Sequence, residues 1–173
     1  MANSSPFWTF SLETYHRPGV PGACVTLQDR CGVDVNILLF CLFLAHSGRA
    51  LSVADVAQMD GAMRDWRQLG VVKLREVRRF LKQPPEAFQG AQVEAFRDRI
   101  KAVELEAERL QQEALFALRP IEAWGVAWGE ASSPEVDVAQ ANLSAYAQWL
   151  DVVFSPQELA PLLVPRQIES QLS

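Results

Sequence analysis

Apolar residues recur along most of the chain at the three- and four-residue spacing of amphipathic α-helices, and alternating strand-like stretches are nearly absent. Residues 35–46 differ from this pattern because they are apolar on every side. A helix without a polar face is buried by its neighbours. The sequence therefore predicts an all-α, single-domain bundle over residues 1–173, with about seven to eight helices around a central apolar helix at 35–46.

Capping residues and helix breakers divide the first half of the chain into separate helices. Short helices are expected at about 6–15 and 21–31, each ended by glycine or proline. Ser52 and Asp55 have the spacing of a capping box, in which each side chain bonds the other residue's backbone N–H. This box predicts a fourth helix that reaches Trp66.

Two further helices follow, and their apolar residues predict which sides are buried. Gly70 should interrupt the chain before a basic helix at 71–82, whose core-facing residues would be Leu74, Val77 and Leu81. The longest helix is expected at 91–118, where the apolar spacing is that of a coiled-coil seam made by Val93, Phe96, Ile100, Val103, Ala107, Leu110 and Ala114.

Residues 119–173 follow a core at 6–118 and are rich in aromatic side chains. A helix is expected from Ser133 to about Val153, and a second capping box at Ser155 predicts a last short helix. Large aromatic side chains mostly serve packing, so we expect this C-terminal extension to fold onto the core. The alternative is that its tryptophans form an interface.

Composition and charge narrow the classes of function that fit this chain. The formal net charge of −5 disfavours a general nucleic-acid-binding protein, whose affinity rests on cationic side chains. Residues 1–9 lack the charge and the apolar stretch of a secretory signal, which predicts a cytoplasmic location. The longest apolar run, 37–45, is too short to cross a bilayer, so no membrane association is expected.

Motifs for common catalytic and metal chemistry are missing from the sequence. There is no glycine-rich phosphate loop, nucleophile elbow or paired-aspartate motif. The two histidines have no ligand partner at metal-binding spacing, and the three cysteines sit in apolar surroundings, which indicates reduced, buried thiols. No metal and no cofactor are expected, no catalytic residue is identified, and an enzyme is the weaker hypothesis.

A polar set lies between two of the most apolar helices and consists of Gln28, Asp29, Asp34 and Asn36. Buried carboxylates and amides need partners, because burying them unpaired costs several kcal/mol. One interpretation is a polar pocket beside the central helix. The other is that Asp34 caps that helix, Asn36 bonds a neighbouring turn and Asp29 is solvated.

The basic helix presents a cationic stripe made of Arg75, Arg78, Arg79 and Lys82. Between Arg64 and Lys82 there are seven basic residues against two acidic ones, in a chain that is acidic elsewhere. Such a stripe fits an acidic partner or a phosphate. Glu104 and Glu108 lie on one side of the long helix, so the alternative is a set of ion pairs between the two helices.

The stretch FWTFSLETYHRPGVPGACVTLQDRCGVDVNILLFCLFLA, the basic helix and KAVELEAERLQ together resemble the proteobacterial DUF2390 family, whose function is unknown. The resemblance spans roughly 6–118 and includes Pro18, Gly19, Cys24, Leu27, Gln28, Asp29, Asp34, Asn36, Trp66, Arg75, Glu104 and Glu108. It implies a small helical bacterial protein of the cytoplasm, and it assigns no catalytic residue.

These observations favour a helical adaptor or regulatory protein that binds a protein partner through the cationic stripe or the aromatic extension. A helical bundle that binds or transforms a small molecule is the alternative, with a pocket formed by Asp29, Asp34, Asn36, Arg75 and Glu104. Association with RNA or the ribosome through residues 64–82 is less favoured, and a homo-oligomer is possible. The combined candidate binding residues are Gln28, Asp29, Asp34, Asn36, Trp66, Arg75, Arg78, Arg79, Lys82, Glu104 and Glu108.

Overall fold

The computed structural model describes residues 4–128 and 135–164. Its α-helices are α1 (Pro6–Tyr15), α2 (Val20–Cys31), α3 (Val35–His46), α4 (Val53–Trp66), α5 (Val72–Phe80), α6 (Ala91–Ala117), α7 (Glu135–Trp149) and α8 (Pro156–Leu159). Shorter elements are η1 (Arg67–Val71), η2 (Glu86–Phe88), η3 (Ile121–Ala123) and the antiparallel strands β1 (Arg49–Ala50) and β2 (Val126–Ala127). The predicted all-α fold is confirmed. None of the described helices is both long and apolar enough to cross a membrane.

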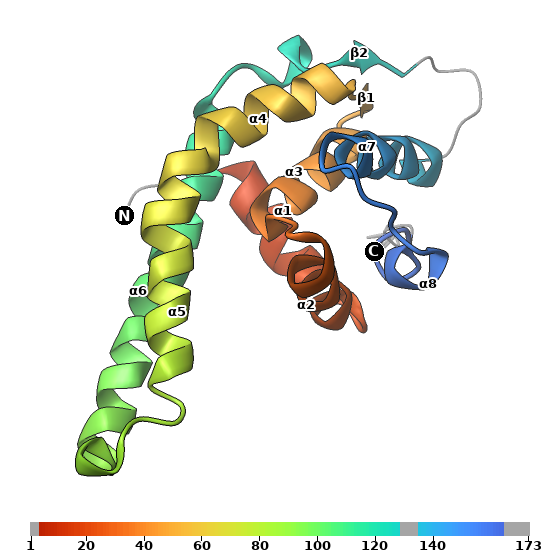
Figure 1. Cartoon of the computed structure of the whole chain (residues 1–173). Coiled ribbons are helices and arrows are strands. Elements are labelled where there is room, and N and C mark those ends of the chain that lie inside the picture. Colours follow the sequence, from red (N-terminus) through yellow and green to blue (C-terminus); the bar gives the residue numbers. More distant parts are fainter. Residues whose placement is uncertain (1–3, 129–134, 165–173) are drawn as a thin grey trace, which may run out of the picture.

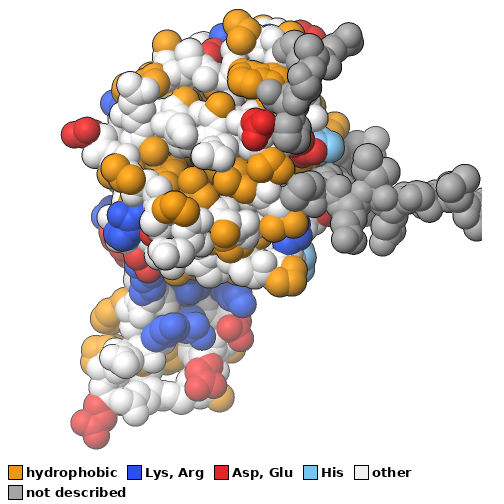
Figure 2. Space-filling model, turned by 90° about the vertical axis from the view of Figure 1, so that its right-hand side faces the viewer, with side chains coloured by type: hydrophobic (Ala, Val, Ile, Leu, Met, Phe, Trp, Pro, Cys, Tyr) orange, Lys and Arg blue, Asp and Glu red, His pale blue; other side chains and the backbone are white. Residues whose placement is uncertain are grey.

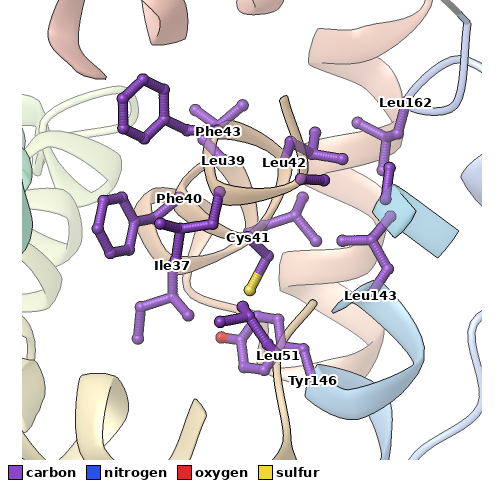
Figure 3. Packing of buried hydrophobic residues seen from close by; sticks show 14 of the residues in the cluster. Ile37, Leu39, Phe40, Cys41, Leu42, Phe43, Leu51, Leu143, Tyr146 and Leu162 are labelled. Carbon is purple, nitrogen blue, oxygen red and sulfur yellow. The ribbon is translucent and has the colours of Figure 1, made fainter. Parts of the chain in front are cut away.

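Helix α3 lies at the centre of the body, as the sequence predicts (Figure 1). Ten of its twelve residues are buried, because neighbouring helices cover every side of it. α7 packs along it with Leu143 and Tyr146 fully buried, and α1 contributes Phe7 on another side. Figure 3 shows side chains of α3 and α7 meeting in this cluster. The central apolar helix is therefore confirmed.

The described aromatic residues of the C-terminal extension mostly serve packing. Trp124, Tyr146 and Phe154 are buried in the core, and the Arg119 guanidinium lies 3.5 Å from the centre of the Trp124 ring. The predicted capping box at Ser155 begins α8. α7 ends at Trp149, before the predicted Val153, and the predicted start at Ser133 lies outside the described residues.

α5 and the first half of α6 form an antiparallel hairpin that projects from the body, which we call the arm (residues 72–103; Figure 1). No residue of α5 is buried, and the buried residues of α6 all lie in its second half. The prediction that Leu74, Val77 and Leu81 face a core is therefore wrong. Two helices that pack mainly on each other leave most of their surface in water.

The predicted interruption at Gly70 is also wrong. η1 is a π-helical turn that joins α4 to α5 without a break. Glycine inside a helix costs only about 1 kcal/mol relative to alanine, so contacts elsewhere can retain the helix. The Trp66 indole N–H donates to the carbonyl oxygen of Ala107 at 3.0 Å and fixes this turn against α6.

Candidate functional site

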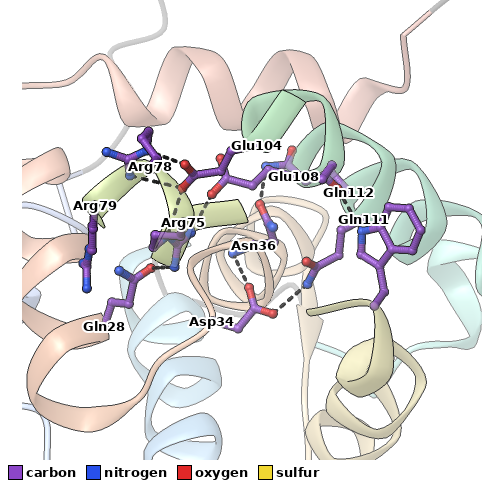
Figure 4. A network of polar contacts seen from close by, with 12 residues as sticks. Gln28, Asp34, Asn36, Arg75, Arg78, Arg79, Glu104, Glu108, Gln111 and Gln112 are labelled. Carbon is purple, nitrogen blue, oxygen red and sulfur yellow. Dashed lines mark hydrogen bonds and ion pairs between the residues drawn. The ribbon is translucent and has the colours of Figure 1, made fainter. Parts of the chain in front are cut away.

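The base of the arm is tied to the body by partly buried ion pairs between α5 and α6 (Figure 4). Arg75 donates from Nε to Glu104 Oε1 at 3.0 Å, from Nη2 to Glu108 Oε1 at 2.6 Å and from Nη1 to Gln28 Oε1 at 2.6 Å. Arg78 donates to both carboxylate oxygens of Glu104. Arg75 and Arg78 of the predicted cationic stripe therefore have partners within the chain.

Folding moves the pKa values of the two glutamates in opposite directions. Burial raises the pKa of Glu104, but the hydrogen bonds from Arg78 and Arg75 together outweigh burial and lower it. Burial also raises the pKa of Glu108, and there the single bond from Arg75 does not reverse the effect. Glu104 is thus the anion that folding stabilises.

Because folding lowers the pKa of Glu104, its ion pairs stabilise the protein fully above the ordinary glutamate pKa of about 4.3. This contribution is lost as the pH falls through the lower folded-state pKa. We expect Glu104→Gln to lower the free energy of unfolding by about 1 to 2 kcal/mol near pH 7, a difference that shrinks below about pH 4. Urea unfolding of both proteins across pH 3 to 7 measures it.

Glu106→Gln is the matched control, since Glu106 pairs with Arg109 on the exposed side of the same helix. Exposed pairs contribute little, so this variant should unfold as the parent protein does at every pH. A Glu104→Gln difference that did not change with pH would contradict the assignment.

A second polar cluster lies beside the first and holds the start of α3. Asp34 caps α3 through the backbone N–H of Asn36, and its Oδ2 accepts from Gln111 Nε2 at 2.6 Å and Arg67 Nη1 at 3.3 Å. Arg67 Nη1 also donates to Asp60 Oδ1 at 2.5 Å. Asp34 therefore caps α3, as one of the two sequence interpretations expects.

The same interpretation is wrong for Asn36, whose side chain accepts from Gln112 Nε2 at 2.8 Å and so connects α3 to α6 instead of bonding a neighbouring turn. Sequence reasoning missed four members of the two buried clusters, namely Asp60, Arg67, Gln111 and Gln112. One signal was available, because Asp60 lies in the buried stripe of α4 beside Met59. A carboxylate at a core position indicates a buried cation.

The remaining predicted residues lie on the surface. Asp29 and Arg79 form an exposed pair at 3.2 Å, and Trp66 is exposed apart from its indole bond. Lys82 is exposed and makes no side-chain hydrogen bond or ion pair within the part of the chain that the structure describes.

A cleft of about 380 Å³ opens between the arm and the body. The predicted residues Gln28, Asn36, Arg75, Glu104 and Glu108 line it, together with Arg78 and Arg79. Asp29 and Asp34, which the sequence placed in the same pocket, lie outside it. Figure 2 shows Lys and Arg side chains gathered where the arm leaves the body, next to a band of hydrophobic side chains.

Reactive groups are scarce in the described ranges, 4–128 and 135–164. No three of their His, Cys, Asp and Glu side chains are arranged to hold a metal ion. Burial raises the pKa values of Cys24 and Cys41 to about 12, so both thiols stay protonated at neutral pH.

The fold and the site together define a helical protein whose basic arm is tied to a compact body beside an open, charged cleft. The chain belongs to the DUF2390 family, because the model of this protein family of unknown function matches residues 6–115. The resemblance predicted from the sequence is thus confirmed. No curated protein and no solved structure matches the chain.

Proposed function

We propose that the protein is an adaptor that binds a helical segment of a partner protein along one edge of α6. The observation that supports this is an apolar stripe on α6, where Phe96, Val103 and Leu110 are 42%, 52% and 43% exposed. Their seven-residue spacing is that of one position of a coiled coil and places them along a single edge of the helix.

Part of the other half of the same seam is covered by the chain itself. Ala107 is buried and Ile100 is half-buried, so this side of α6 packs on its neighbours. A coiled-coil seam is complete only when both apolar positions are covered. The open half of the seam on α6 therefore has the geometry to accept one more helix.

Charge favours an acidic partner. Residues 72–103 contain eight Lys and Arg against four Asp and Glu, although the whole chain has a formal net charge of −5. Arg75 and Arg78 are occupied by Glu104, so an exposed cation such as Lys82 would contact the partner. We expect an amphipathic helix with an apolar residue every seven positions and Asp or Glu beside it.

The proposal predicts a position-specific crosslink. A photo-crosslinking amino acid at Val103 should capture one protein in cells of the source organism, through a segment with the acidic amphipathic pattern. Phe96→Glu in the same protein should lower the yield about tenfold or more, because an interface anchor is worth 1.4 kcal/mol or more. Mass spectrometry of the crosslinked peptide identifies the segment.

Val153 is the control position, because it is 79% exposed and lies on the connection between α7 and α8. Equal capture at both positions, or a yield that Phe96→Glu does not change, would show that the α6 edge is not the contact. Capture of a second copy of the chain would replace the adaptor with a homo-oligomer. Capture of RNA in place of protein would favour the nucleic-acid interpretation of the basic arm.

A further inference from the structure

We infer that the cleft between the arm and the body binds a small amphipathic carboxylate, with its apolar part against α1 and α2 and its carboxylate against cations of α5 and α6. The inference does not rest on the proposed adaptor role. Lys101 and Leu105 line the cleft, whereas Val103 lies two residues from each of them. Two residues correspond to about 200° around a helix, so the cleft and the apolar stripe lie on different edges of α6.

The size and apolar lining of the cleft fit an organic ligand. Its volume of about 380 Å³ lies within the range of small-molecule sites, roughly 300 to 1,000 Å³. Leu12, Tyr15, Val25 and Leu105 line it and are each between 37% and 54% exposed. Scattered exposed apolar residues are ordinary, but several around one hollow indicate a binding surface.

The charges in the cleft favour an anion. Four cations and two carboxylates line it, and the carboxylates of Glu104 and Glu108 are already paired with Arg75 and Arg78. Arg79 has only the exposed contact to Asp29, and Lys101 has no side-chain partner within the described residues. An exposed ion pair exchanges at little cost, so Arg79 and Lys101 can both turn to a ligand carboxylate.

Two buried polar atoms in cleft-lining residues are without a partner among the residues that the structure describes. Ser11 and Gln112 are 2% and 5% exposed, and within the described ranges neither Ser11 Oγ nor Gln112 Oε1 has a hydrogen-bond partner. Buried polar atoms in proteins are nearly always paired. A carboxylate only accepts hydrogen bonds, so a ligand carboxylate can reach Gln112 Oε1 only through an ordered water that donates to both, and the same water can accept from the serine hydroxyl.

Sodium decanoate, kept below its micelle concentration, tests the inference on the full-length protein. Titration followed by 1H–15N NMR should shift the indole signal of Trp8, which also lines the cleft, with saturation at one ligand per chain. Trp8→Phe assigns that signal. Decanol and decyltrimethylammonium, which lack the negative charge, should bind at least tenfold more weakly.

Variants locate the site. Leu105→Trp fills the cleft and should abolish saturation, and Arg79→Ala with Lys101→Ala should weaken decanoate binding about tenfold or more. Lys73→Ala with Arg99→Ala removes two other exposed arm cations as the matched control and should leave binding unchanged. Unfolding temperatures equal to that of the parent protein show that each variant is folded.

The inference would be overturned by no saturable shift with decanoate, by saturation that survives in Leu105→Trp, or by equal weakening by the control pair. Phosphatidylglycerol vesicles distinguish the source of the anion. If the protein floated with these vesicles but showed no saturable binding of decanoate, the cations would bind a lipid headgroup. That result would also overturn the inference.

Discussion

Replacing Asp34 with alanine is expected to lower the free energy of unfolding by about 3 to 4 kcal/mol. The substitution removes the cap of α3, worth about 1 kcal/mol, and takes a charged acceptor away from Gln111 and Arg67. Removing one partner of a buried ion pair costs about 3 to 5 kcal/mol, because the other charge is left in a low dielectric. Asp60 still pairs with Arg67 in the variant, so the expected loss of stability lies at the lower end of that range.

Urea unfolding followed by circular dichroism measures this loss. Asp34→Asn keeps a capping oxygen but removes the charge, so its loss should be about half as large. Asp29→Ala is the matched control, since its pair with Arg79 is exposed and should contribute no more than about 1 kcal/mol. If Asp34→Ala cost no more than this control, the cluster would not be holding α3.

Replacing Asn142 with alanine is expected to lower the free energy of unfolding by about 3 kcal/mol. Asn142 is fully buried on α7 and joins three segments of the chain. Its amide nitrogen donates to the carbonyl oxygens of Cys41 and Arg49 at 3.0 Å, and its Oδ1 accepts from the backbone N–H of Leu51 at 2.8 Å. Each buried backbone group left unpaired costs about 1 to 3 kcal/mol.

Ser144→Ala controls for changes to α7 itself, because its hydroxyl is exposed and bonds only within the helix, to Gln140. It should alter stability by no more than about 0.5 kcal/mol. Thermal unfolding of both variants gives the comparison. Similar curves for the two would show that α7 is held by its apolar contacts alone.

Local signals in the sequence predicted several helices of the body. The capping box at Ser52, the box at Ser155 and the apolar run of α3 each depend on neighbouring residues, and the structure confirms all three. The arm could not be predicted in the same way. The seam of α6 has the same pattern whether its partner belongs to the chain or to another molecule, so Phe96 and Val103 were assigned to the core.

The candidate site was predicted only in part, because helical spacing encodes some of its contacts whereas others join residues far apart in the sequence. Helical spacing placed Glu104 and Glu108 on one side of α6, where Arg75 meets them. The bond between Gln111 and Asp34 joins residues 77 positions apart, and no local pattern encodes it. The apolar wall of the cleft also escaped prediction, because exposed Leu12 and Tyr15 have the same helical pattern as core residues.

The π-helical turn at Arg67–Val71 sets the rotational phase of the arm. A π turn contains one residue more than an α turn, and one residue corresponds to about 100° around the helix axis. An uninterrupted α-helix from α4 to α5 would thus point Arg75 and Arg78 roughly a quarter-turn away from Glu104. The one extra residue in this turn therefore decides which side of the hairpin turns its basic side chains toward the cleft and which side is left apolar.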